Sequence, residues 1–136
     1  MHPHPYSNLA FLQSSGPLDQ AAAWASLDAT KRKQLKQQYN DKGVSIVVSA
    51  FGGSESPTSK GLDPVTLGGQ MAKFVLDTDL DGIDVVWDDT QAALKTGGAG
   101  EQWLTTFTQT LRSSLPNGQY ILTHARICTI HLQEAR

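Results

Sequence analysis

The sequence contains a single cysteine, Cys128, among its 136 residues. One thiol cannot form an internal disulfide and cannot hold a metal ion by itself. His2 and His4 add two imidazoles on a proline-spaced amino-terminal segment, but a closed metal site requires three or four ligands that converge. We therefore expect no disulfide framework, no metal and no other cofactor.

Charge and long apolar runs are also scarce. Charged residues make up 18% of the chain and its net charge is -2, so no basic surface is expected to hold a nucleic acid. No apolar run approaches the roughly 18 residues that a membrane span requires. The first residues, MHPHPYSNLAF, lack the charged and apolar regions of a secretory signal. We expect one soluble domain that binds neither nucleic acid nor a membrane, with no compartment assigned.

Apolar runs typical of buried strands alternate with apolar repeats typical of helices. Strands are expected over 8–12, 44–49, within 81–89 and over 120–123, and helices over 28–41, 64–77 and 101–115. A polar, Ala-rich connection separates the first strand from the first helix. Crossovers of this length suit parallel strands and right-handed βαβ units. The predicted fold class is α/β, and periodicity alone does not separate an open doubly wound sheet from an arc of a (β/α) barrel.

Acidic residues interrupt the apolar run DGIDVVWDD at 81–89. Because side chains alternate along a strand, Asp84, Val86 and Asp88 share one face, and Val85 and Trp87 share the other. The apolar pair is expected to pack under helices. Ligands of parallel sheets bind at the carboxyl ends of the strands, so we expect the acidic face to line a polar crevice there.

Two motifs on consecutive predicted strands resemble those of glycoside hydrolase family 18, the chitinases and related endo-β-N-acetylglucosaminidases. Residues 81–88, DGIDVVWD, are similar to the DGxDxDxE signature of the fourth barrel strand, and residues 49–53, SAFGG, to the SxGG-type motif of the third. Segments 8–11 and 120–125 look like the second and fifth strands. The resemblance implies that residues 1–125 form a partial (β/α)8 TIM barrel of about four parallel βα units, followed by a non-family tail at 126–136.

The resemblance also implies hydrolysis of β-1,4-linked N-acetylglucosamine, in chitin or an N-glycan core, by substrate assistance. It places Asp88 at the position of the Glu proton donor and Val86 at that of the Asp that orients the acetamido group, with Asp84 as a further catalytic carboxylate. Because Asp is one methylene shorter than Glu, the carboxyl is withdrawn by roughly 1 Å, which can lower the rate of hydrolysis on the order of 10²-fold. Losing the orienting charge at Val86 is expected to lower the rate by another ~10²-fold. Hydrolysis is therefore expected to be feeble or absent.

Further candidates for substrate binding are Phe51, Gly52, Gly53, Asp81, Val86 and His124. Asp81 is as consistent with a turn as with a ligand contact, and a lone histidine such as His124 is more often structural than functional. Trp87 is expected in the core rather than as a sugar platform. Asp89 is the less favoured proton donor because a continuing strand would point it away from Asp88.

A complete barrel of this kind needs eight βα units and typically ~250 residues. We therefore expect a truncated or alternatively spliced product whose exposed strand edges pair with a second copy. Two rival hypotheses stay open: a lectin-like protein that binds these sugars without cleaving them, and a self-associating remnant that has no ligand of its own. Family members are often secreted, whereas this sequence shows no signal peptide.

Overall fold

The computed structural model describes residues 5–52, 55–89 and 98–125. Its strands are β1 (Tyr6–Gln13), β2 (Gly16–Pro17), β3 (Ser45–Phe51), β4 (Gly82–Val86) and β5 (Ile121–Ala125). Its helices are α1 (Asp19–Ser26), α2 (Ala29–Asp41), α3 (Pro64–Asp77) and α5 (Ala99–Ser114). The expected strands and helices agree with these bounds to within two residues. The tail at 126–136 lies outside the described residues.

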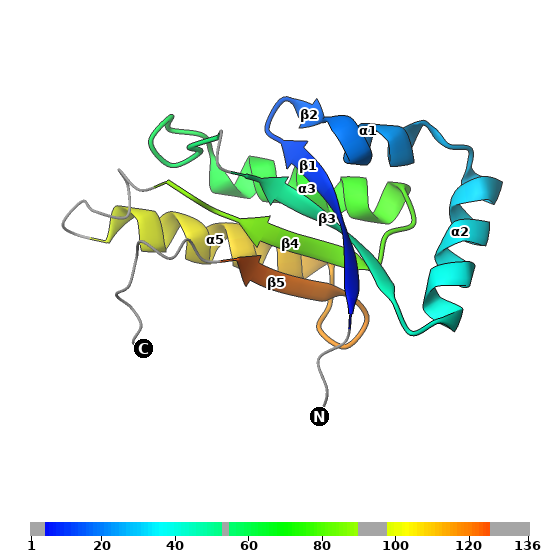
Figure 1. Ribbon diagram of the computed structural model, residues 1–136. Coiled ribbons are helices and arrows are strands. Elements are labelled where there is room, and N and C mark those ends of the chain that lie inside the picture. The colour runs from blue at the N-terminus through cyan, green and yellow to red at the C-terminus, as the bar shows by residue number, and fades with distance from the viewer. Residues whose placement is uncertain (1–4, 53–54, 90–97, 126–136) are drawn as a thin grey trace.

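One sheet with the strand order β2-β1-β3-β4-β5 organises the chain (Figure 1). β1, β3, β4 and β5 are parallel, and the short β2 pairs antiparallel with β1. Apart from β2, the strands lie in the order of the sequence, and all the described helices contribute side chains to one core on one face. The predicted α/β class is confirmed. A doubly wound sheet has helices on both faces, so of the two arrangements that the sequence left open the structure has the barrel-like one, in line with a partial βα barrel.

The core lies between the sheet and the helices α3 and α5. β3 and β4 contribute alternate side chains to it, and the helices contribute residues spaced three or four apart. These core residues are Ile46, Val48, Ala50, Ile83, Val85, Leu67, Met71, Val75, Trp103, Phe107 and Leu111. Each large apolar side chain buried in this way stabilises the fold by about 1.5–3 kcal/mol.

Two of the helices begin at an aspartate cap. Asp28 accepts a hydrogen bond from the Lys31 backbone N–H at the start of α2. Asp63 accepts one from the Thr66 backbone N–H at the start of α3, where Pro64 is the first helical residue. No helix among the described residues is long and apolar enough to cross a membrane.

The Ala-rich segment after β1 differs from its expected role as a connection, because it contains the helix α1. Ala21 and Trp24 are the buried residues of α1, and the Trp24 indole N–H donates to the Thr78 carbonyl at 2.7 Å. With one large apolar residue in eight, the segment shows no apolar repeat that would predict a helix, although its four alanines favour one.

Candidate functional site

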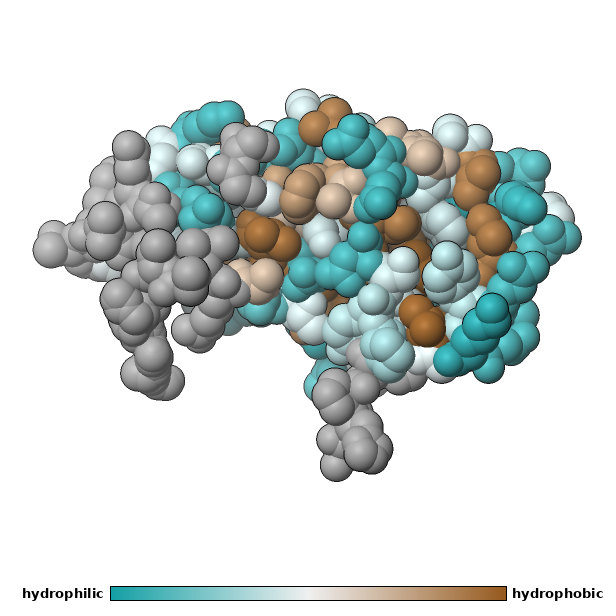
Figure 2. Space-filling model, in the orientation of Figure 1, coloured by the Kyte–Doolittle hydropathy of each residue, from teal (hydrophilic) through white to brown (hydrophobic). Residues whose placement is uncertain are grey.

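The carboxyl ends of β1, β3, β4 and β5 meet at one edge of the sheet. On the sheet face opposite α3 and α5, here called the inner face, Ser49 of β3 is in register with Asp84 of β4, and Asp84 with Thr123 of β5. Figure 2 views this side of the molecule, where hydrophobic and hydrophilic residues form a mosaic. The register brings three polar side chains from distant parts of the chain into one row.

Asp84 is the centre of a hydrogen-bond network on the inner face. The Asn8 amide donates to Asp84 Oδ2 at 3.1 Å and lies 3.4 Å from Ser49 Oγ. The Thr123 hydroxyl donates to Asp84 Oδ1 at 2.6 Å. Asp84 is only 9% exposed, and burying a carboxylate is costly unless it is hydrogen-bonded. Both carboxylate oxygens have a donor, which accounts for an acidic residue within an otherwise apolar strand.

The next row toward the carboxyl edge is apolar on the inner face. Val86 is in register with Phe51 on β3 and with Ala125 on β5. Phe51 has a φ of 74°, and its ring packs in the core against Trp103 and Phe107, with centroid distances of 5.9 and 5.3 Å. Val86 and Ala125 therefore provide no hydrogen-bonding side chain between the Asp84 network and the strand end.

Three consecutive residues follow β4 at this edge. The Trp87 indole N–H donates to the Thr58 hydroxyl at 3.1 Å, and Asp89 is 1% exposed and accepts from the Ser59 backbone N–H at 2.6 Å. Asp88 is half-buried and has no hydrogen-bond partner among residues 5–52, 55–89 and 98–125. At ~3.3 Å per residue, Asp88 lies ~13 Å along the chain from Asp84. Trp87 also packs against the core, as expected.

The end of β3 turns sharply at Gly52, which has a φ of 86°. A Cβ atom built on Gly52 would lie 2.9 Å from the Phe11 ring. The Gly52 N–H donates to the Val86 carbonyl at 3.1 Å, and the Gln13 amide donates to the Phe51 carbonyl at 3.1 Å. The absence of a side chain at Gly52 thus lets the ends of β1, β3 and β4 approach one another closely.

Two of the residues predicted to bind substrate, Phe51 and His124, point away from the inner face at the carboxyl edge. Phe51 has no exposed surface, so its ring contacts no ligand in this conformation. His124 is exposed and points toward α5, where Nε2 lies 3.1 Å from the Thr108 hydroxyl. Gly53 lies outside the described residues. Val86 and Gly52 are at the edge, as expected.

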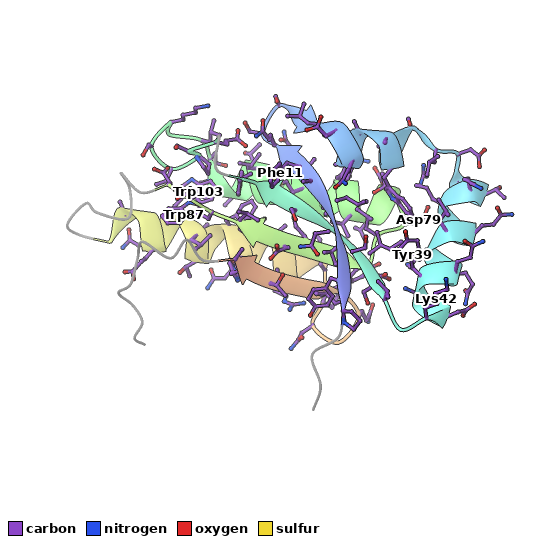
Figure 3. All side chains as sticks on the ribbon, in the orientation of Figure 1. Phe11, Tyr39, Lys42, Asp79, Trp87 and Trp103 are labelled. Atoms are coloured by element: carbon purple, nitrogen blue, oxygen red, sulfur yellow. The ribbon has the colours of Figure 1, made fainter. Side chains whose placement is uncertain are left out.

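Asp81 lies at the opposite, amino end of β4. It accepts from the Ile46 backbone N–H at 2.8 Å and from the Asn40 amide at 3.1 Å, and it pairs with Lys36 at 3.4 Å. Figure 3 shows this end of the molecule, with Tyr39 in α2, Lys42 at the end of α2 and Asp79 beside the helix, far from Trp87 and Trp103 at the other end. These contacts make Asp81 a link between α2, β3 and β4.

Sequence reasoning missed Asn8 and Thr123 as members of the site. Both belong to segments that were predicted as strands, but their role depends on which side chains of other strands lie close to them. Among the described residues, no three His, Cys, Asp or Glu side chains gather as a metal site would require.

No protein-family model matches the sequence, and neither does any curated protein sequence. The structure is similar to the crystal structure of a GH18 chitinase from Pseudoalteromonas aurantia, with a TM-score of 0.69 and 30% sequence identity. The alignment covers 91% of this chain and 48% of that chitinase, so the chain spans about half of the length of the solved structure. The chain has a chitinase-like fold.

Proposed function

We propose that this chain is a chitinase-like domain whose carboxyl edge recognises saccharides containing N-acetylglucosamine and hydrolyses them feebly or not at all. One observation carries the proposal. Asp84 accepts hydrogen bonds from Asn8 and Thr123, but the apolar row of Val86 and Ala125 separates this network from Asp88.

Substrate-assisted hydrolysis requires two groups at this edge. An acid must protonate the leaving oxygen, and a second polar group must hold the acetamido group that attacks the sugar carbon. Asp88 is the residue that we assign to the first role. Val86 stands where the second would be, and its side chain can neither accept a hydrogen bond nor carry charge.

Asp84 does not replace the missing group. Its two oxygens are held by Asn8 and Thr123, and Val86 lies between it and the strand end. To reach a sugar beside Asp88, Asp84 would have to leave both donors and extend by several ångströms. Binding through the remaining polar groups is thus favoured over catalysis. The chitinase-like fold supports N-acetylglucosamine as the ligand class.

Calorimetric titration with chitin oligosaccharides tests recognition, with Asp88→Ala as the site variant and Lys73→Ala as the control. Lys73 pairs with Asp77 on the exposed surface of α3, far from the carboxyl edge. We expect binding by the natural chain and by the control, and weaker binding by Asp88→Ala. A flat titration for the natural chain would reject the sugar site and favour the hypothesis of a remnant without its own ligand.

Release of a chromophore from an N-acetylglucosaminide oligomer tests catalysis in the same proteins. We expect slow or undetectable release. If the natural chain and Asp88→Ala release it at equal rates, Asp88 is not the acid; release at the rate of an ordinary chitinase would contradict the proposed impairment.

We also propose that two copies of the chain associate through β5. Among the described residues, no strand pairs with the outer side of β5. Unpaired N–H and C=O groups on such an edge are a template for pairing with another chain. The occupant that we propose is a second copy, which presents the same edge.

A further inference from the structure

The loop that precedes α3 holds the residues on both sides of Asp88. Trp87 donates from its indole N–H to the Thr58 hydroxyl at 3.1 Å. Asp89 accepts from the Ser59 backbone N–H at 2.6 Å and from the Ser59 hydroxyl. Residues 87 and 89 are therefore attached to neighbouring residues of one segment, here called the anchoring loop, residues 55–62.

The anchoring loop is itself fixed at two other places. Glu55 is 5% exposed and accepts from the Ser14 backbone N–H at 3.1 Å and from the Ser14 hydroxyl. The Trp103 indole N–H donates to the Leu62 carbonyl at 2.6 Å. Figure 3 shows Trp87 and Trp103 at the same end of the molecule. The loop is thus attached to the turn after β1 through Glu55 and to α5 through Leu62, and Ser59, which contacts Asp89, lies between these two attachments.

The direction of Asp88 follows from these attachments. In an extended chain, side chains at positions two apart point the same way and the one between them points the opposite way. Trp87 and Asp89 both point to the anchoring loop. We propose that Asp89 is a positioning residue, which directs Asp88 to the inner face, the face of Asp84. Its effect on sugar binding rests on the proposed function.

Burial gives this attachment its strength. Asp89 is 1% exposed, and a carboxylate that left the Ser59 donors would remain buried without those partners. Hydrogen bonds to a charged acceptor are also stronger than those between neutral groups. Asp89 is therefore a better anchor than a proton donor, because a donor must be exposed to its substrate.

The direction of residue 88 is testable without any sugar. Nitroxide labels at Asp88→Cys and Leu76→Cys, with Cys128→Ser removing the native thiol, report the distance between the site and the exposed end of α3. We expect one narrow distance distribution, which becomes broad when Asp89→Ala is added. The matched control is Asp81→Ala, which removes a carboxylate with a backbone N–H partner from the other end of β4. Equal distributions for Asp89→Ala and for the control would overturn the proposal.

A thermodynamic cycle then tests whether Asp89 acts through Asp88. The affinity for a chitin oligosaccharide is measured for Asp89→Ala, Asp88→Ala and the double variant. We expect Asp89→Ala to weaken binding on the order of ten-fold and to have no further effect once Asp88 is absent, because coupled residues are not additive. Independent losses that add would identify a merely structural role and overturn the proposal.

Two further comparisons distinguish a failure of this proposal from a variant that does not fold and from a failure of the proposed function. If Asp89→Ala does not fold, Ser59→Ala removes one donor and leaves the carboxylate in place, and the same broadening is expected, at smaller amplitude. If the natural chain binds no chitin oligosaccharide, the proposed function fails, and the nitroxide distances alone decide whether Asp89 directs residue 88.

Discussion

The Thr123 hydroxyl donates a hydrogen bond of 2.6 Å to Asp84 Oδ1, across the junction of β5 and β4. The two residues are in register and 39 positions apart in the chain. This bond, together with the Asn8 amide on the other oxygen, makes the inner face of the sheet a place where a carboxylate is stable.

Removing the Thr123 hydroxyl should destabilise the fold. Thr123→Val keeps the shape of the side chain but leaves Asp84 Oδ1 without this donor, at a cost of about 1.5–3 kcal/mol in the free energy of unfolding. Urea denaturation measures it. Thr108→Val is the control, because its hydroxyl contacts His124 at an exposed position and its loss should cost about 0.5 kcal/mol or less. Equal losses for the two variants would contradict the importance of the Asp84 network.

Restoring both family-like acidic groups should create or raise hydrolytic activity. Val86→Asp supplies a polar group in the apolar row, and Asp88→Glu extends the acid by one methylene. Each change should contribute ~10²-fold in the rate of chromophore release. Activity that stays unchanged in Val86→Asp/Asp88→Glu, in a protein that folds and binds the oligosaccharide, would show that more than these two groups is missing.

Gly52→Ala should be more destabilising than Gly118→Ala. Both glycines have a positive φ, 86° and 91°, so both variants bear the cost of a left-handed backbone, about 1–2 kcal/mol. Only at Gly52 would the new Cβ meet a neighbour, the Phe11 ring at 2.9 Å; at Gly118 nothing lies within 4 Å. The midpoint of urea unfolding compares them.

The close contact at Gly52 can be isolated by trimming the ring. In a Phe11→Ala background, the extra cost of Gly52→Ala should fall to that of Gly118→Ala. Costs that remain different in this background would place the strain elsewhere than at the ring.

The Asp63 cap should make stability depend on pH. Hydrogen bonds from the Thr66 side chain, and then from its backbone N–H, hold the pKa of Asp63 below its usual value. The carboxylate is therefore favoured in the folded state. Its contribution to the free energy of unfolding is present above the unfolded-state pKa and is lost as the pH falls through the folded-state pKa.

Asp63→Asn tests this linkage, because asparagine is also a good capping residue but does not titrate. Urea unfolding at about pH 7 and about pH 3 should show a larger acid-induced loss for the natural chain than for the variant. The same loss in both proteins would exclude Asp63 as a source of the pH dependence.

Pairing through the β5 edge should depend on its outward backbone groups. The Ile121 N–H faces β4, where it donates to the Asp81 carbonyl at 2.9 Å, so by alternation the Leu122 N–H points to the open side. Leu122→Pro removes that donor, and Leu122→Ala removes the same packing but keeps the donor. Sedimentation velocity should show a dimer for the natural chain and Leu122→Ala, and a monomer for Leu122→Pro. A compact monomer of the natural chain at micromolar concentration would reject the association.

The helix α1 and the orientation of Phe51 are two features of the fold that the sequence did not predict. Trp24 attaches α1 to the core, where its indole N–H donates to the Thr78 carbonyl, 54 residues later. Phe51 has even spacing from Ser49, which predicts the inner face, yet its left-handed backbone turns the ring into the core. Both side chains contact partners that are distant in sequence, so no local pattern predicts these contacts.

The sequence by itself determined the alternation of strands and helices and the placing of Asp84 and Val85 on opposite faces of β4, because these features repeat with the geometry of a single element. Only the tertiary structure decided which side chains meet across the sheet. The register places Thr123 beside Asp84. The packing of the strands brings the Asn8 amide to the same carboxylate, and the anchoring loop brings Ser59 to Asp89. Hydrogen-bond partners in a parallel sheet come from different βα units, and the packing of whole helices fixes how those units align.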